Sequence, residues 1–440
     1  MKQEKTAIAA GLCTRDPRLF AERMEELKGL ISASGMRCID TLVQSMDHEE
    51  SATLIGSGKA EELKALLEMR DADCVVFLNA LTPSQLSNLA ELLDTEVLDK
   101  TGLILNIFSE RARTAEAKMQ VEYAKLGYML PRLVGLRKNL SRQGGTGGSM
   151  SNKGAGEKQI ELDRRHIEKR MSELRKGLAQ VESGRETQRK KREREGMPLV
   201  ALCGYTNAGK STLMNSLLKA TGAEIEKHVL EKDMLFATLD TTVRRISPED
   251  HRDFLLSDTV GFIDDLPHSL VKAFRSTLSE IQLADLIIQV VDYSDAQYQR
   301  HMAVTEETLK DLSAGHIPMI YVMNKADKMP ELGSLPRVQG NRIYLSAKEG
   351  CGIRELIERI SAVLYGAAVT KQLLIPYSDG AAEHFLRNTA QVFSCEYTET
   401  GIKMQCRLGE RLLQEVGQYV VEEIQPQTDG SVKKQSAEKK

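Results

Sequence analysis

The sequence lacks the patterns that mark several large classes of protein. Its seven cysteines are scattered without a C-x-x-C pair, so neither a disulfide framework nor a paired-thiolate metal site is indicated. No apolar run approaches the roughly 18 residues that a membrane-spanning helix needs. A convincing secretory signal is also absent, and His228, His251, His268 and His384 show no metal-ligand spacing. We therefore expect a cytoplasmic protein with reduced, buried thiols and no membrane span.

Charge is present in both signs but is unevenly distributed. The chain of 440 residues carries a net charge of −3, and its length predicts two to four domains. Residues 132–195 contain 18 Lys and Arg against 9 Asp and Glu, which leaves −12 for the rest of the chain. A basic block on an acidic chain is typical of nucleic-acid contact. A solvated helix face would give the same composition.

The segment Gly204–Ser211 reads G-Y-T-N-A-G-K-S, between the apolar run Leu199–Leu202 and the helical pattern Thr212–Leu218. A strand, this spacing and a helix together predict a phosphate-binding loop. Its glycines let backbone N–H groups face the phosphates, and the helix N-terminus adds partial positive charge. We expect Lys210 to reach the β- and γ-phosphates and the Ser211 hydroxyl to ligate magnesium.

The base is indicated by Asn324–Asp327, which follows a buried strand pattern and reads N-K-A-D. A carboxylate in the base plane can accept hydrogen bonds from N1–H and the 2-amino group of guanine. With adenine, Asp327 would remain an unpaired charge. Ser346–Lys348 follows a further short strand and resembles the second base-contacting loop of GTPases. Several independent parts therefore agree on guanine.

Two switch segments lie between these motifs. The strand pattern Phe254–Asp258 ends in D-x-x-G. Asp258 is predicted to support the magnesium ion, and the Gly261 N–H to sense the γ-phosphate. Residues 236–242 form the candidate first switch, in which Thr238 is the predicted second magnesium hydroxyl. Thr241 and Thr242 are alternatives for this role, and a threonine-rich edge strand would explain the composition as well.

Position 262 departs from the usual catalytic pattern. Many GTPases carry a glutamine after D-x-x-G to orient the attacking water. Phe262 cannot hydrogen-bond a water, so slow intrinsic hydrolysis is predicted, with help from a partner or a bound ion. Asn207 suggests one such ion, because G-x-x-N-x-G-K-S resembles the loop of potassium-assisted GTPases.

Two apolar stripes predict a pair of long antiparallel helices that contains the basic block. One comprises Met119, Tyr123, Leu126, Leu130 and Leu133; the other repeats every seven residues from Ile160 to Val181. Such spacing is typical of a coiled coil. The segment 141–157 between them is rich in glycine, so its backbone could approach a phosphate chain closely. A flexible linker and an RNA-contacting tip are both compatible with this composition.

The motifs together resemble the HflX-type ribosome-associated GTPases of the Obg–HflX group. The resemblance covers residues 50–350 and is carried by Leu54–Leu63, Asp99–Leu105, Leu140–Gly145, Asp163–Arg165, the phosphate-binding loop and Phe236–Asp240. The glycine-rich tip departs from the R-G-P-G-E pattern of the family, and Thr241 stands where the family often has proline. The resemblance implies a monomeric factor that binds GTP and magnesium, docks on rRNA and protein of the large ribosomal subunit and dissociates stalled or idle ribosomes. A GTP-gated assembly or silencing factor, or a regulatory switch acting on protein partners, remains an alternative.

The predicted fold class is α/β, with four structured parts. These are a small α/β domain (1–105), a basic helical hairpin (106–195), a P-loop GTPase domain (197–366) and a small α+β domain (370–424), before a disordered tail (425–440). Gly56–Lys59 in the first domain resembles a phosphate loop without its full spacing. A turn before a helix or a second nucleotide site would account for it.

These expectations assign named residues to each site. The predicted nucleotide contacts are Gly204, Tyr205, Thr206, Asn207, Ala208, Gly209, Lys210, Ser211, Thr212, Phe236, Thr238, Asp258, Gly261, Asn324, Lys325, Asp327, Ser346, Ala347 and Lys348. The catalytic positions are Lys210, Thr238, Gly261 and Phe262, and the magnesium ligands Ser211, Thr238 and Asp258. The candidate RNA contacts are Arg137, Lys138, Arg142, Gly144, Gly145 and Lys153.

Overall fold

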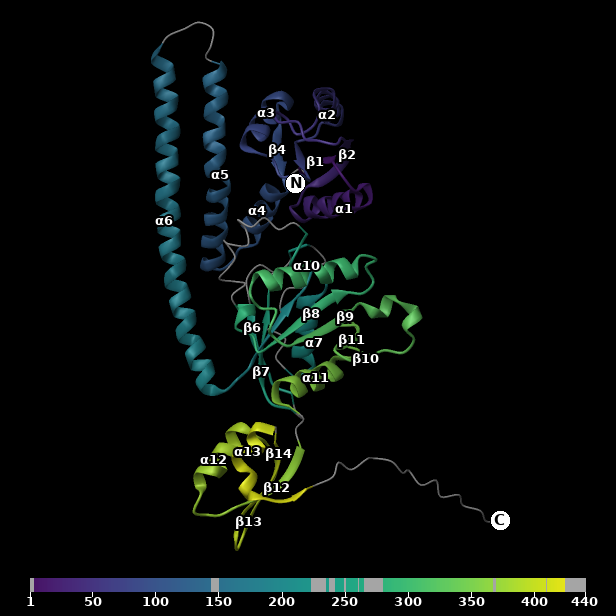
Figure 1. The fold of residues 1–440 in the computed structure, drawn as a ribbon, viewed down its shortest axis with the longest axis vertical. Helices are drawn as coiled ribbons and strands as arrows, with labels where there is room; N and C mark the ends of the chain where they lie inside the picture. The colour runs from purple at the N-terminus through teal and green to yellow at the C-terminus, as the bar shows by residue number, and fades with distance from the viewer. Residues whose placement is uncertain are drawn as a thin grey trace, which may run out of the picture.

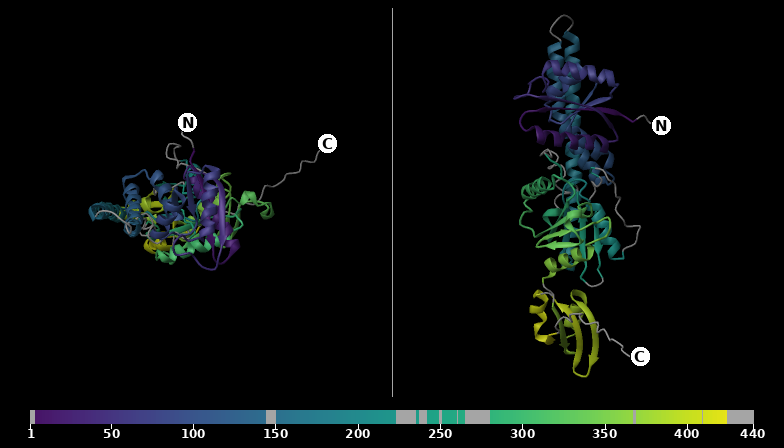
Figure 2. Two further views of the ribbon diagram at one scale, coloured as in Figure 1. Left: turned by 90° about the horizontal axis from the view of Figure 1, so that it is seen from above. Right: turned by 90° about the vertical axis from the view of Figure 1, so that its right-hand side faces the viewer.

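The computed structural model describes residues 4–143, 150–222, 235–236, 242–248, 251–259, 261–264, 280–366, 369–408 and 410–423. Three sheet-containing domains follow one another along the long axis, and a pair of long helices lies beside the first two of them (Figures 1 and 2). The predicted α/β class with a helical arm and a small C-terminal domain is confirmed. None of the described helices is both long and apolar enough to cross a membrane.

The N-terminal domain is a parallel sheet in the order β2-β1-β3-β4, with helices on both faces. Alternate residues of β1 face opposite sides: Ile8 packs in one apolar cluster, and Ala7 packs with α1 and α4 in another. Asp16 caps α1, and a Thr82–Gln85 capping box starts α3, as expected at helix N-termini. The elements are β1 (Thr6–Cys13), α1 (Pro17–Ala33), β2 (Arg37–Ser45), α2 (Ser57–Arg70), β3 (Cys74–Phe77), α3 (Pro83–Leu93), β4 (Glu96–Asp99) and α4 (Lys100–Arg111). The expected domain boundary at residue 105 falls inside α4.

The arm consists of α5 (Ala115–Gln143) and α6 (Met150–Glu195). Their antiparallel register follows from two close approaches: a Cβ on Gly177 would lie 3.0 Å from Met119 Sδ, and one on Gly127 would lie 3.8 Å from Met171 Cε. The expected tip 141–157 differs from this arrangement, because both helices extend into it. The glycine content predicted a loop, because each glycine costs a helix roughly 1 kcal/mol, whereas extending an existing helix avoids the larger cost of nucleating a new one.

The middle domain has a seven-stranded sheet in the order β10-β11-β9-β8-β5-β7-β6, parallel except at its two edge strands. The interior strand β5 is fully buried, as expected where helices cover both faces. The elements are β5 (Leu199–Cys203), α7 (Lys210–Ala220), β6 (Thr242–Ile246), β7 (Phe254–Asp258), β8 (Leu286–Asp292), α10 (Tyr298–Asp311), β9 (Met319–Asn324), η2 (Ala326–Lys328), η3 (Pro330–Leu332), β10 (Arg337–Gln339), β11 (Arg342–Tyr344) and α11 (Ile353–Tyr365).

The C-terminal domain is a four-stranded antiparallel sheet in the order β13-β14-β12-β15. Leu373, Met404 and Leu386 lie in its apolar core, and the domain stands at the end of the molecule farthest from the arm tip (Figure 1). Its elements are β12 (Val369–Ile375), α12 (Gly380–Thr389), β13 (Gln391–Thr398), β14 (Gly401–Leu408), α13 (Glu410–Val416), η4 (Gly417–Tyr419) and β15 (Val420–Glu423). The expected tail, residues 425–440, lies outside the described residues.

Candidate nucleotide-binding site

The loop between β5 and α7 requires glycine at both ends. Gly204 has φ of +144°, and a Cβ there would lie 2.1 Å from the carbonyl oxygen of Val290. Gly209 has φ of +93°, and a Cβ would lie 2.3 Å from Nδ2 of Asn324. Any larger residue would therefore push the loop away from the neighbouring strands β8 and β9. The backbone is held where its N–H groups can surround phosphates.

Lys210 is the first residue of α7 and is only 7 % exposed. Its Nζ donates to the carbonyl oxygens of Gly204 (3.1 Å) and Tyr205 (2.8 Å), so the ammonium group lies across the loop. Burial lowers the Lys210 pKa to about 8, and the nearby carboxylate of Asp258 partly opposes this shift. A bound phosphate would favour the charged ammonium form.

The described magnesium candidates lie together. The Ser211 hydroxyl donates to Oδ2 of Asp258 at 2.7 Å, and Asp258 is fully buried at the end of β7. One hydroxyl and one carboxylate suit Mg²⁺, which keeps several waters and binds substrate phosphates as well. Among the described residues there is no group of three or more His, Cys, Asp or Glu that could hold a metal by itself. Thr238 and the alternative Thr241 lie outside the described residues, whereas Thr242 begins β6.

Asn324 connects the two predicted base-binding motifs to the phosphate loop. Asn324 Nδ2 donates to the carbonyl oxygen of Ala208 (2.9 Å), and its Oδ1 accepts from the backbone N–H of Ala347 (3.0 Å). Ser346 and Ala347 are buried, while Lys348 and Asp327 are exposed. Asp327 lies in the short helix η2 directly after β9. The structure thus places N-K-A-D and S-A-K at the carboxyl ends of adjacent strands, where ligands of α/β sheets bind.

Lys325 has a partner that the sequence analysis missed. Its Nζ donates to Oδ2 of Asp292 (2.7 Å) and to the carbonyl oxygen of Asn207 (3.0 Å). Asp292 ends β8, and its position at the carboxyl end of a strand beside the phosphate loop was the available signal. The ion pair ties the base motif to β8, and the hydrogen bond to Asn207 ties it to the phosphate loop.

The second switch begins against the phosphate loop. Thr206 N–H donates to the Phe262 carbonyl (2.8 Å), and Phe262 N–H donates to the Gly204 carbonyl (3.1 Å). A Cβ on Gly261 would lie 2.9 Å from Thr206 Cα and 3.0 Å from Lys210 Nζ, so only glycine fits this approach. The Phe262 side chain is 3 % exposed and packs in the core. It is therefore not placed to act on a water.

Phe236, predicted to contact the nucleotide, is oriented towards the N-terminal domain. Its side chain is 2 % exposed and meets Phe108 of α4 edge-on, with ring centroids 4.7 Å apart. Nη1 of Arg111 donates to the Phe236 carbonyl at 3.1 Å. The start of the first switch thus packs against α4. The nucleotide contact stays a prediction.

The remaining predicted contacts are less fully described. The backbone of Arg137, Lys138 and Arg142 lies in α5 and that of Lys153 in α6, but the side chains of residues 134–160 lie outside the described part. Gly144 and Gly145 are also outside it. Gly56 and Ser57 form the start of α2, as a turn before a helix would, and the second nucleotide site stays a prediction.

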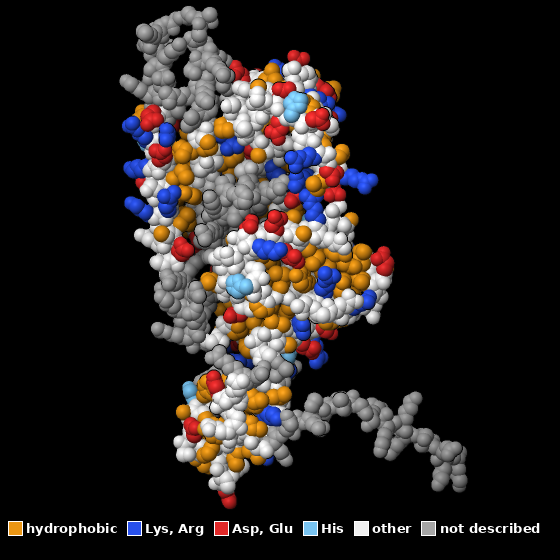
Figure 3. Space-filling view, viewed as in Figure 1, with side chains coloured by type: hydrophobic (Ala, Val, Ile, Leu, Met, Phe, Trp, Pro, Cys, Tyr) orange, Lys and Arg blue, Asp and Glu red, His pale blue; other side chains and the backbone are white. Residues whose placement is uncertain are grey.

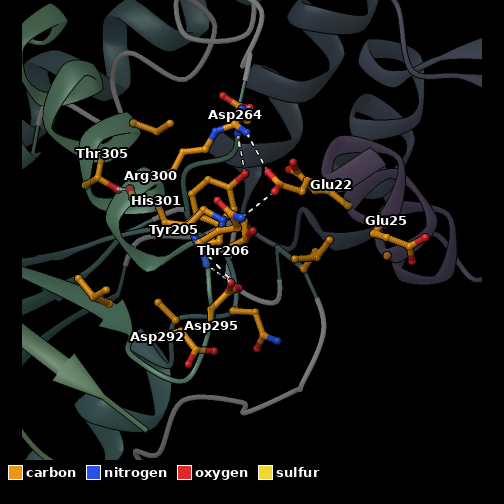
Figure 4. Close-up of a pocket in the computed structure, with 18 of the residues that line it drawn as sticks. Glu22, Glu25, Tyr205, Thr206, Asp264, Asp292, Asp295, Arg300, His301 and Thr305 are labelled. Atoms are coloured by element: carbon orange, nitrogen blue, oxygen red, sulfur yellow. Dashed lines mark hydrogen bonds and ion pairs between the residues drawn. The ribbon is translucent and has the colours of Figure 1, made fainter. Parts of the chain in front are cut away.

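A cavity of about 590 Å³ lies beside the phosphate loop, between the N-terminal and middle domains. Its walls are residues of α1, the loop segment Tyr205–Ala208, the end of β8 and α10 (Figure 4). Lys210, Ser211 and Asp327 do not line it. The cavity therefore shares one side of the phosphate loop with the predicted nucleotide site but lies away from the predicted magnesium and base residues.

The fold and the site define a P-loop GTPase, and comparisons with known proteins give the family. Three family models match in succession: "GTP-binding GTPase N-terminal" over residues 21–109, "GTP-binding GTPase Middle Region" over 111–192 and "50S ribosome-binding GTPase" over 199–325. The GTPase HflX of Caldanaerobacter subterraneus subsp. tengcongensis is 40 % identical over 395 residues, covering 89 % of both chains. That of Escherichia coli is 39 % identical over 365 residues, covering 82 % of this chain and 83 % of the relative. The chain belongs to the HflX family of GTPases, which bind and hydrolyse GTP.

A solved structure of SsGBP in complex with GDP also resembles the chain. It is 25 % identical, with a TM-score of 0.46, and covers 82 % of this chain and 99 % of that chain.

Proposed function

We propose that this GTPase binds the large ribosomal subunit in its GTP form and dissociates stalled or idle ribosomes, with hydrolysis stimulated by that contact. The observation that carries the proposal is the charge of the arm. Residues 133–160, at the tip end of the helix pair, contain five Lys and Arg and a single acidic residue. Such a surplus favours contact with a phosphate backbone.

The arm is less basic between its ends. In residues 161–184, six basic residues face five acidic ones, and several are paired: Arg164 with Glu168 (2.9 Å), and Arg170 with Glu122 (2.7 Å). Figure 3 shows Lys and Arg side chains (blue) interspersed with Asp and Glu side chains (red) along the described part of the arm. The tip end is therefore the better candidate for RNA contact, and the paired region provides a natural control.

The arm is firmly attached to the N-terminal domain. Asp99 is 1 % exposed, and its carboxylate accepts from the Tyr128 hydroxyl (2.7 Å) and from Nη2 of Arg132 (3.1 Å), both on α5. Ala117 and Val121 of α5 are buried in the core shared with α4. A rigid attachment lets a contact at the tip act on the rest of the molecule.

Magnesium and potassium are the ions proposed for the site. Ser211 and Asp258, with Thr238, would hold Mg²⁺, which when bound neutralises charge between the β- and γ-phosphates. Asn207 is exposed at the edge of the phosphate loop, and we assign it to a monovalent cation. Equal hydrolysis rates in sodium and potassium buffers would refute that assignment.

The experiment combines sedimentation with ribosome profiles. Four basic residues near the tip, Arg137, Lys138, Arg142 and Lys153, are changed to Gln. The matched control changes four arginines that have partners within the arm: Arg164, Arg165 and Arg170, which are paired with glutamates, and Arg175, which donates to the Tyr123 hydroxyl. Only the tip variant should lose salt-sensitive binding to large subunits in the presence of a GTP analogue. The wild type should also convert intact ribosomes to subunits.

The outcomes separate the alternatives. Binding without any conversion to subunits would favour an assembly or silencing factor. Binding that is lost equally in both variants, or that is insensitive to salt, would contradict RNA contact through the tip. No binding at all would favour a switch acting on other protein partners.

A further inference from the structure

Asp264, three residues after the switch glycine, is held by groups from two domains. Its carboxylate pairs with Arg23 of α1 (3.0 Å) and, closely, with Arg300 of α10. Its backbone carbonyl accepts from Lys100 Nζ of α4 (3.0 Å), and its backbone N–H donates to the Tyr205 hydroxyl (2.9 Å). The residue is 8 % exposed. The first residues of the second switch are thus tied to the N-terminal domain and the phosphate loop at once.

Tyr205, the second residue of the phosphate loop, is held equally tightly. Its ring stacks on His301 of α10, with centroids 3.9 Å apart and an interplanar angle of 13°. Burial raises the pKa of both Tyr205 and the nearby Glu26 of α1. Figure 4 shows Tyr205, His301, Arg300 and Asp264 gathered beside the cavity. The phenol therefore connects the phosphate loop to α10 and to Asp264, which α1 holds in turn through Arg23.

The connection continues into the arm through two consecutive residues. Asp99 holds Tyr128 and Arg132 of α5, while the next residue, Lys100, donates to the carbonyl oxygen of Asp264. A displacement of the arm relative to the middle domain must strain or break the Lys100 contact. The adjoining cavity leaves part of α1 without packing against α10, and interfaces between domains of one chain commonly permit relative motion.

In the described conformation, Lys210 and Gly261 are not yet arranged to bind a γ-phosphate. Lys210 Nζ donates to two loop carbonyls, and a Cβ on Gly261 would lie 3.0 Å from that Nζ. Receiving a γ-phosphate requires Lys210 to turn towards it and the Gly261 N–H to approach it. A change at Gly261 moves Asp264, because only two residues separate them. Holding Asp264 in place therefore opposes the rearrangement.

We propose that Asp264 and Tyr205 are positioning residues that couple the docking of the N-terminal domain and arm to the nucleotide state of the second switch. In the described conformation α1 and α4 restrain the switch and disfavour its GTP form. Binding couplings are reciprocal. If the contact of α1 with Asp264 lowers the affinity for GTP, bound GTP must weaken that contact by the same factor. The proposal concerns nucleotides alone, so it stands or falls independently of ribosome binding.

The test compares affinities for a non-hydrolysable GTP analogue and for GDP in the full chain. Arg23→Gln removes one ion pair to Asp264. Tyr205→Phe keeps the ring for stacking on His301 but removes the hydroxyl that accepts from the Asp264 N–H. Each should raise the ratio of analogue to GDP affinity by about fivefold or more, the lower end of typical couplings. Arg70→Gln, which removes the 3.0 Å pair with Asp40 inside the N-terminal domain, should leave the ratio unchanged.

A purely structural role would lower stability without moving this ratio. The proposal is overturned if both variants keep the wild-type ratio or lower it. Should either variant fail to fold, hydrogen exchange in the unaltered chain decides instead. Amides of α1 (Pro17–Ala33) should exchange faster with the GTP analogue than with GDP, and equal or slower exchange would overturn the proposal.

Discussion

At the scale of single residues, the site is organised by side chains that bind other protein groups as well as the predicted ligand. Asn324 joins the phosphate loop to the S-A-K loop through two hydrogen bonds, at 2.9 and 3.0 Å. Lys325 joins the same loop to β8. Asp327, in contrast, takes no part in these two connections, and its side chain is exposed. It is therefore the residue at which base recognition can be altered without disturbing the scaffold.

Asp327→Asn should lower GTP affinity by about 10- to 100-fold, since a hydrogen bond to a charged group contributes about 1.5–3 kcal/mol. Inosine triphosphate lacks the 2-amino group, so its affinity should fall less and the preference for GTP should shrink. Isothermal titration with both nucleotides measures this, with Glu331→Gln, an exposed carboxylate in the next short helix, as the control. An unchanged preference for GTP would remove Asp327 from the base site.

Nucleotide affinity should depend on pH through Lys210. Burial places its pKa at about 8, below the usual 10.5, and phosphate favours the protonated form. Above pH 8 binding must therefore take up a proton, and affinity for GDP should fall by up to about tenfold per pH unit. Below pH 8 the dependence should vanish.

The same depressed pKa has a consequence for folding. Between pH 8 and 10.5 the unfolded chain holds the proton that folded Lys210 has lost, so this group makes stability rise with pH over that window. GDP affinity is measured across this pH range for the wild type and for Lys210→Gln. The variant should bind GDP weakly, and its affinity should not change with pH in this way. A variant with the wild-type pH profile would show that another group titrates.

At the scale of elements, Phe262 changes meaning between sequence and structure. In the sequence, its position after D-x-x-G indicated only that a water-orienting residue is missing. In the structure its ring is 3 % exposed, and its backbone forms hydrogen bonds with both Gly204 and Thr206. The residue fastens the second switch to the phosphate loop. Its lack of a water-orienting group still predicts slow unaided hydrolysis.

Phe262→Ala should accordingly destabilise the folded chain by about 3–5 kcal/mol, the usual cost of truncating a buried phenylalanine. Phe393→Ala in β13, where the side chain is 50 % exposed, should change stability by about 0.5 kcal/mol or less. Urea unfolding followed by circular dichroism compares the two. Equal small effects would mean that the Phe262 ring contributes nothing to the core.

Local elements were largely predictable, because their signals are local. The run Leu199–Cys203, the G-x-x-x-x-G-K-S spacing and the following helix fixed the phosphate loop, and apolar stripes predicted two antiparallel helices. The helix ends at the arm tip were less predictable: Met150 already lies in α6, since glycine content alone does not say where propagation stops. The contacts of Asp264 with Arg23 and Lys100 were not predictable from one sequence, because these partners are 241 and 164 residues away.

At the scale of the whole molecule, the arm tip, the N-terminal domain, the GTPase domain and the C-terminal domain succeed one another along the long axis (Figure 2). The tip is remote from the phosphate loop, so a signal between them must pass through packed elements. Asp99 and Lys100 supply such a route, because one holds α5 and the other holds the second switch. This arrangement is compatible with our proposal that contact with the large ribosomal subunit stimulates GTP hydrolysis.

The rate of GTP hydrolysis with and without purified large ribosomal subunits tests this account most directly. We predict slow hydrolysis by the protein alone and a strong, salt-sensitive stimulation by large subunits, which the tip variant loses and the paired-arginine control retains. Stimulation should be absent with small subunits. Fast hydrolysis by the protein alone, or a rate that large subunits leave unchanged, would contradict the account.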